Sequence, residues 1–132
     1  MITVDLALRL RAAGLEWVPA SGDRFVIPGR DMDADVFVVS ELTIDVHQGP
    51  TGPLIRFNGT VEWALDSVPQ DAVVWLPRED QLREALGLRF RGLEPIGDGY
   101  AVTISGRYGE ERHVDVDAER AYARALLSML GG

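Results

Sequence analysis

Apolar residues near both ends of the chain recur every three to four positions, as they do along one face of a helix. This spacing predicts a helix over 3–13, capped by Thr3 and ended at Gly14, and a last helix over 118–130, capped by Asp117. The inner face of the first helix is formed by Ile2, Leu6, Leu10 and Ala13. The inner stripe of the last helix is formed by Ala121, Tyr122, Ala125, Leu126 and Met129.

Between these helices much of the chain alternates apolar and polar residues with a period of two, which is typical of strands with one solvent-facing side. The predicted strands are 24–27, 35–40, 42–47 and 54–57, followed later by 89–94, 100–105 and 112–116. The Gly- and Pro-rich residues 49–53 are typical of a hairpin connection. Connections of this length favour an antiparallel sheet.

Two central helices are expected between the two β regions. The first covers 60–68 and ends at Pro69, and the second covers 77–86, with Pro77 at its first position and Gly87 as its stop. With 132 residues the chain has the length of one domain. We therefore expect a single α+β domain over 1–132, an antiparallel sheet packed with N-terminal, central and C-terminal helices.

The charge balance bears on the partners. Thirteen basic and 21 acidic residues give a formal net charge of −8, and no segment carries the cationic surface that nucleic acid or an anionic membrane requires. The apolar runs are too short for a membrane span. No secretory signal is visible at the N-terminus, so a cytoplasmic protein is expected.

Two residue types are missing from the sequence, and their absence excludes several chemistries. All 13 basic residues are arginine, which excludes a lysine Schiff base and the lysine of a phosphate-binding loop. Because the chain has no cysteine, thiol catalysis, thiolate metal sites and disulfides are also excluded.

The acidic triplet Asp31, Asp33 and Asp35 resembles the start of a calcium-binding loop. The match fails at Val36, where that loop needs glycine, and at Leu42, where it needs glutamate. The two histidines, His47 and His113, alternate with apolar neighbours in predicted strands and so face away from the core. With a carboxylate they form a metal site only where their strands are adjacent. We expect no metal and no cofactor.

Trp63 is a candidate contact residue, because on a helix over 60–68 it falls opposite the apolar stripe and beside Asp66. Together with Arg78 these residues form the predicted contact surface, since tryptophan and arginine are favoured at protein contacts. A weak homodimer is expected through a terminal helix, because Leu127, and likewise Val4 and Leu8, fall opposite the inner stripes of their helices.

Two functions follow from these patterns. The first is a non-catalytic binding or adaptor module that recognises a protein partner, because the chain contains no recognisable catalytic spacing. The alternative is a carboxylate-based or weakly metal-assisted hydrolase that uses Asp31, Asp33, Asp35 and a histidine.

A resemblance rests on two stretches, residues 57–66 and residues 75–82, of which the second reads Trp-Leu-Pro-Arg-Glu-Asp-Gln-Leu. They resemble a family of small uncharacterised bacterial proteins, some of which carry a pilus-assembly label. The Trp-Leu-Pro-Arg-x-x-Gln-Leu core is also similar to short phage proteins. The resemblance extends from Trp17 to the last helix, and no catalytic residues come with it.

Overall fold

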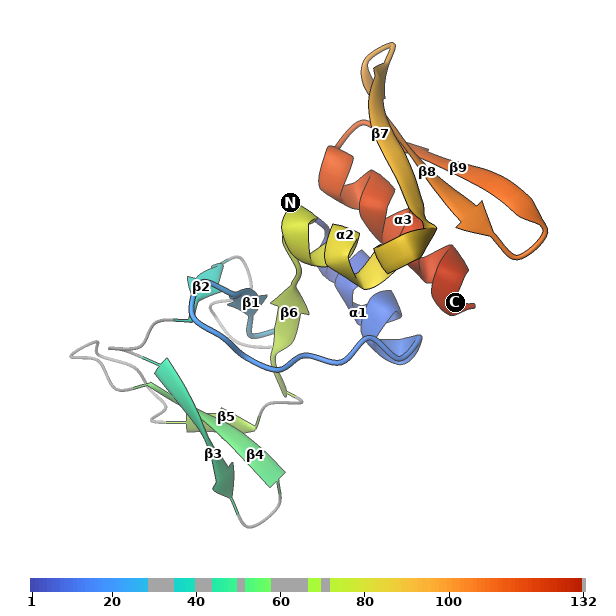
Figure 1. The fold of residues 1–132 in the computed structure, drawn as a ribbon. Helices are drawn as coiled ribbons and strands as arrows, with labels where there is room; N and C mark the ends of the chain where they lie inside the picture. The colour runs from blue at the N-terminus through green and yellow to red at the C-terminus, as the bar shows by residue number, and fades with distance from the viewer. Residues whose placement is uncertain (29–34, 40–43, 50–51, 58–66, 70–71, 132) are drawn as a thin grey trace. The chain divides into compact units, whose positions relative to one another are not determined.

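The computed structural model describes residues 1–28, 35–39, 44–49, 52–57, 67–69 and 72–131 (Figure 1). Its contacts group into two compact units, one formed by Met1–Glu16 with Leu76–Gly132 and the other by Trp17–Trp75. Three α-helices and small antiparallel sheets in the described residues make the protein α+β, as the sequence predicts. The single domain over 1–132 stays a prediction.

The first unit begins with helix α1 (Val4–Ala12). The Thr3 hydroxyl accepts the backbone N–H of Leu6 at 3.1 Å, which satisfies one donor of the first turn. Gly14 has a φ of 109°, a conformation that costs glycine little. The predicted cap and stop are both confirmed, and Leu6 and Leu10 of the predicted inner face are buried.

Helix α2 (Glu79–Leu86) begins two residues later than the sequence predicts. Arg78 precedes it in an extended conformation, and its backbone N–H donates to Gln81 Oε1 at 2.9 Å. Pro77 therefore lies outside the helix rather than at its first position. Gly87 ends α2 with a φ of 57°, and the 3₁₀ turn η2 (Gly87–Arg89) leads into the sheet.

Strands β7 (Phe90–Ile96), β8 (Gly99–Gly106) and β9 (Gly109–Asp115) form an antiparallel meander. Val102 of the central strand pairs with Leu93 on one side and His113 on the other. The buried side chains of Val102 and Ile104 face helix α3 (Ala118–Leu130). Figure 1 shows α3 against this sheet, with its predicted bounds and its Asp117 cap confirmed.

One expectation about α3 is wrong. Helical spacing predicts that Leu127 lies opposite the inner stripe and is exposed, yet only 4 % of it is exposed. The reason is that α3 packs against α1 and α2 as well as against β8 and β9, so apolar positions on several of its sides are covered. Leu127 therefore gives no support to the homodimer, which stays a prediction that depends on the half-buried Val4 and the exposed Leu8.

The second unit contains two small sheets. One has the strand order β2 (Phe37–Val38), β1 (Arg24–Val26) and β6 (Val74–Leu76), and the other has the order β3 (Ile44–Gly49), β4 (Gly52–Phe57) and β5 (Ser67–Pro69). Strands β3 and β4 pair antiparallel up to Gly49 and Gly52, so the predicted hairpin is confirmed. The helix predicted over 60–68 is wrong at its end, because Ser67 and Val68 belong to β5 and pair with β4.

The second unit has its own apolar cluster of Phe25, Ile27, Val39 and Val73, against which Trp17 and Phe37 pack. The ring of Trp17 stacks on that of Trp75, with centroids 6.2 Å apart and an angle of 9° between the planes. The Trp17 indole N–H donates to Asp23 Oδ2 at 2.9 Å. This carboxylate is buried and also accepts the backbone N–H of Ala20 at 3.0 Å. Asp23 thus connects Ala20, in the segment before β1, with Trp17, which packs against the cluster.

Candidate functional site

Of the three predicted contact residues, Arg78 is the one within the described residues, while Trp63 and Asp66 lie outside them. Arg78 is the N-cap residue of α2, and its Nε lies 3.1 Å from Asp80 Oδ1. This ion pair holds the pKa of the Asp80 carboxyl below its usual value, mainly through the hydrogen bond from Arg78. Arg78 therefore stands at the start of the helix that carries the site described next.

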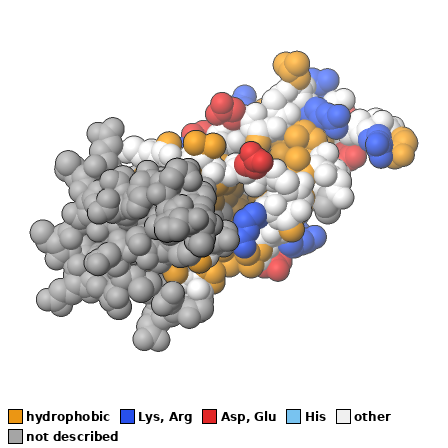
Figure 2. Space-filling model, turned by 90° about the horizontal axis from the view of Figure 1, so that it is seen from below, with side chains coloured by type: hydrophobic (Ala, Val, Ile, Leu, Met, Phe, Trp, Pro, Cys, Tyr) orange, Lys and Arg blue, Asp and Glu red, His pale blue; other side chains and the backbone are white. Residues whose placement is uncertain are grey.

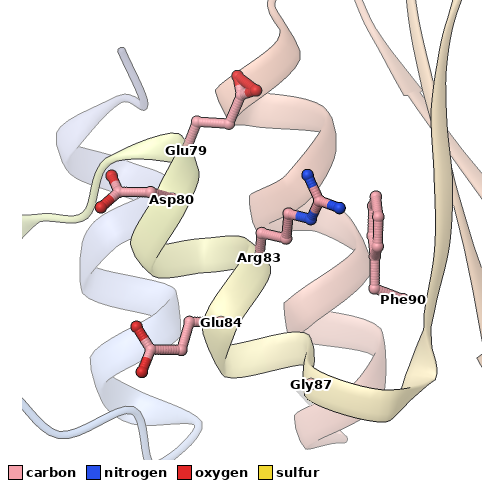
Figure 3. A pocket seen from close by; sticks show the side chains of 6 residues that line it. All are labelled: Glu79, Asp80, Arg83, Glu84, Gly87 and Phe90. Carbon is pink, nitrogen blue, oxygen red and sulfur yellow. The ribbon is translucent and has the colours of Figure 1, made fainter.

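Helix α2 borders an open hollow of about 770 Å³, called the α2 groove below. It is lined by Glu79, Asp80, Arg83, Glu84, Gly87 and Phe90 (Figure 3). All six residues come from α2 and the turn that follows it, or from the first position of β7. The groove therefore lies within the first unit.

Helical spacing determines how these side chains are arranged. Glu79 and Arg83 are four residues apart, as are Asp80 and Glu84, so each pair shares one side of the helix. Figure 3 shows Arg83 pointing toward Phe90, while Asp80 and Glu84 point to the other side of α2. The positive φ of Gly87, which glycine adopts at little cost, ends the helix and lets the chain turn toward Phe90.

The Phe90 ring of the groove contacts the side chains of Arg83 and Tyr122. The guanidinium carbon of Arg83 lies 4.5 Å from the centroid of the Phe90 ring, which is cation–π geometry. On α3 the Tyr122 ring stacks with Phe90 at a centroid distance of 5.7 Å and an angle of 22°. Because Tyr122 is only 1 % exposed, it gives the Phe90 ring a fixed support.

The net charge of the groove lining is negative, because the lining has three carboxylates and one guanidinium. Burial raises the pKa of the Tyr122 hydroxyl, the Glu79 carboxylate raises it further, and Arg83 acts in the opposite direction. Glu119 of α3 lies close as well, since its Oε2 accepts the backbone N–H of Glu79 at 3.2 Å. A cationic group fits this surface better than an anionic one.

The contacts of His113 differ from those expected of a metal ligand. His113 Nε2 lies 3.0 Å from Glu111 Oε1, and the Ser128 hydroxyl donates to the same oxygen at 2.6 Å. The hydrogen bonds from Ser128 and His113 hold the pKa of Glu111 below its usual range. Since the serine donates to the carboxylate and not to the imidazole, this is not the order of groups in a serine nucleophile site.

The acidic triplet is mostly outside the described residues. Asp31 and Asp33 are not among them, and Asp35 is exposed. His47 lies in β3, where it pairs with Leu54 of β4. Across the described residues no group of three or more histidine, aspartate or glutamate side chains is placed to hold a metal ion.

The surface of the described residues is mixed in charge. On the face in Figure 2, arginine and acidic side chains lie among apolar ones rather than in separate areas. Of the helices within the described ranges, none has the length and apolar character that a bilayer span requires.

Arg83 and Phe90, which form the centre of the α2 groove, are not among the contact residues that the sequence pattern predicts. One signal was available, because an acidic first turn, a glycine stop and an aromatic residue follow one another over 79–90. The contact of Arg83 with Phe90 depends on the turn after Gly87, and helical periodicity does not contain that information.

Comparisons of the chain with protein-family models, with curated proteins and with solved structures found no match. The resemblance to small bacterial proteins therefore stays a prediction.

Proposed function

We propose that this protein is a non-catalytic binding module whose α2 groove takes an arginine- or lysine-bearing segment of a protein partner. The observation that supports the proposal is that Phe90, covered by Arg83 on one side of α2, and Asp80 and Glu84 on the other side line the same hollow. The groove thus combines an aromatic surface with carboxylates, and this combination suits a long cationic side chain with an apolar stem.

The contacts suggest how such a segment binds. Arg83 covers one face of Phe90, so the cationic groups of the partner are directed to Asp80 and Glu84. Ion pairs at an exposed surface contribute little each, in the range of about 0.2–1 kcal/mol, so several of them must act together. Binding through this groove is therefore modest in affinity and sensitive to salt. Arg78 at the start of α2 borders the same surface through its ion pair with Asp80.

The net charge of the chain favours the same class of partner. A formal charge of −8 steers cationic molecules toward the protein and repels nucleic acid. We therefore propose that the partner is a protein. We also propose a cytoplasmic location. The alternative, a hydrolase built on Asp31, Asp33 and Asp35, stays a prediction, because two of these residues lie outside the described ranges.

The location of binding can be tested with a synthetic peptide of alternating arginine and glycine. Amide shifts of the labelled protein are followed as the peptide is added, with a peptide of alternating glutamate and glycine as control. The proposal expects saturable shifts concentrated in α2 and at Phe90, and no saturation with the acidic peptide. Shifts spread evenly over all acidic regions of the chain would contradict a binding site in the α2 groove.

A further inference from the structure

A second hollow lies at the end of α3, where that helix meets the turn between β8 and β9. It has a volume of about 270 Å³ and belongs entirely to the first unit. Its charged and polar lining residues are Arg89, Arg107, Glu111 and Ser128, and its apolar lining includes Ile104 and Met129. This hollow is called the α3 pocket below. No residue of the α2 groove lines it.

Glu111 supplies the negative charge of the α3 pocket. Glu111 Oε1 accepts the Ser128 hydroxyl at 2.6 Å and lies 3.0 Å from His113 Nε2. These two contacts fix the carboxylate and keep it ionised, and its other oxygen lies against the backbone of Gly106, in the pocket lining. The last carbonyl groups of a helix have no partner within it and carry partial negative charge. Leu130 and Gly131 at the end of α3 line the same pocket.

The lining of the pocket also includes two cationic side chains. The guanidinium of Arg107, in the turn between β8 and β9, makes no ion pair with any of the described residues. Arg89 also lines the pocket and is close enough to Glu111 to lower the pKa of its carboxyl. Two guanidinium groups near one hollow are suited to a carboxylate, which arginine binds in bidentate geometry.

The apolar part of the lining comes from β8 and α3. Ile104 of β8 is fully buried, and Met129 of α3 is partly buried. The pocket is smaller than the range of about 300–1,000 Å³ that is typical of drug-sized ligands. A ligand that fits must therefore be small and must carry a positive group, a negative group and an apolar part.

We propose that the α3 pocket binds a small zwitterion of the α-amino-acid class with an apolar side chain. The carboxylate of the ligand pairs with Arg107 and Arg89, and its ammonium group lies between Glu111 and the carbonyl end of α3. The apolar side chain of the ligand contacts the partly exposed Met129 of α3. The site makes the protein a receptor for such a ligand, independent of the α2 groove.

The first test is a titration of the labelled protein with L-leucine, followed by amide shifts. We expect saturable shifts over Ser128–Gly131 and in the β8–β9 turn, with α2 unaffected. N-acetyl-L-leucine lacks the ammonium group and L-leucinamide lacks the carboxylate, so each is expected to bind about tenfold more weakly. No saturation with L-leucine, or equal binding of N-acetyl-L-leucine, overturns the proposal.

The second test uses matched variants with the same change of charge. Arg107→Gln is expected to weaken L-leucine binding about tenfold, whereas Arg9→Gln on the exposed side of α1 leaves it unchanged. Thermal unfolding of both variants checks that the fold is intact, which is expected because Arg107 is exposed. Equal affinities of the two variants for L-leucine overturn the assignment of the ligand carboxylate to Arg107. Failure of the peptide titration leaves these outcomes unaffected, because that experiment probes α2.

Discussion

The guanidinium of Arg83 covers the ring of Phe90 at 4.5 Å from its centroid, and this contact joins α2 to the first residue of β7. Tyr122 supports the same ring from α3. The protein therefore supplies its own cation to an aromatic ring at the edge of an acidic groove. Removal of the Arg83 guanidinium should change the affinity for a cationic peptide. The size of that change, compared with a control of equal charge, distinguishes binding in the groove from nonspecific attraction.

We expect Arg83→Gln to bind an arginine-rich peptide about threefold more tightly than the wild-type protein. The substitution frees one face of Phe90 and removes the one positive charge among the described residues that line the groove. A cation–π contact at an exposed site contributes about 0.5–1 kcal/mol. Isothermal titration calorimetry measures the effect. Arg9→Gln, which changes the net charge equally but lies on α1, is the control. An affinity of Arg83→Gln at or below that of the control would count against a role of Phe90 in binding.

Tyr122 provides a test of the groove electrostatics. We expect its hydroxyl to titrate above the ordinary pKa of 10.0, because burial and the carboxylate of Glu79 both disfavour the tyrosinate. Arg83→Gln should raise this pKa further and Glu79→Gln should lower it, as followed by NMR of the Tyr122 ring carbon. The pKa of the Tyr122 hydroxyl is raised in the folded state, so the neutral hydroxyl favours folding. This contribution is complete below the unfolded-state pKa and is lost as the pH rises through the folded-state pKa. An ordinary pKa in all three proteins would refute the arrangement.

Asp115 is expected to stabilise the first unit through α3. Its carboxylate accepts the backbone N–H of Asp117 at 3.1 Å and pairs with Arg124 at 2.8 Å and Arg120 at 3.0 Å. Asp115→Asn should lower the free energy of unfolding by about 1–3 kcal/mol at neutral pH, measured by urea titration. Glu16→Gln, at an exposed position, is the control.

The loss at Asp115 should depend on pH in a defined direction. Burial acts to raise the pKa of Asp115, but the Asp117 N–H and the two arginines outweigh it and hold the pKa below 3.8. The stabilisation is therefore present above 3.8 and disappears as the pH falls through the folded-state value. A constant difference in stability between wild type and Asp115→Asn down to strongly acidic pH would show that the carboxylate charge has no part in it.

In the second unit we expect Asp23→Ala to be more damaging than a substitution at any exposed acid. The buried Asp23 carboxylate accepts the Trp17 indole N–H and the Ala20 N–H, and its loss leaves both donors without that partner. The expected cost is about 2–4 kcal/mol in a denaturant titration, whereas Asp35→Ala should change stability by less than about 0.5 kcal/mol. Similar values for the two variants would mean that Asp23 is not essential to the packing of Trp17.

Local features of the sequence were sufficient to predict the helices at the two ends. Thr3, Gly14 and Asp117 satisfy backbone groups within a few residues of themselves, so their roles are independent of the rest of the fold. Leu127 was mispredicted for the opposite reason. Its burial depends on the packing of several elements around α3, which the period of one helix does not contain.

The candidate sites were less predictable than the helices. Arg78 stays a predicted contact residue, whereas Phe90 and Arg83 meet because of a turn that only the structure defines. Glu111 and Ser128 are 17 residues apart, and they meet because α3 crosses the sheet at β9. His113 was considered as a metal ligand, and its partner proved to be a neighbour in the same strand, Glu111.

The claim that the α2 groove binds cationic segments is tested most directly by the affinity of one arginine-rich peptide for two double variants of equal charge. Asp80→Asn/Glu84→Gln removes both carboxylates on one side of the groove, and Glu16→Gln/Glu110→Gln removes two exposed carboxylates elsewhere. Calorimetry at about 0.1 M salt, where the Debye length is about 10 Å, limits long-range effects. Our account predicts that the groove variant binds about tenfold more weakly than the control variant. Equal affinities of the two variants would contradict it.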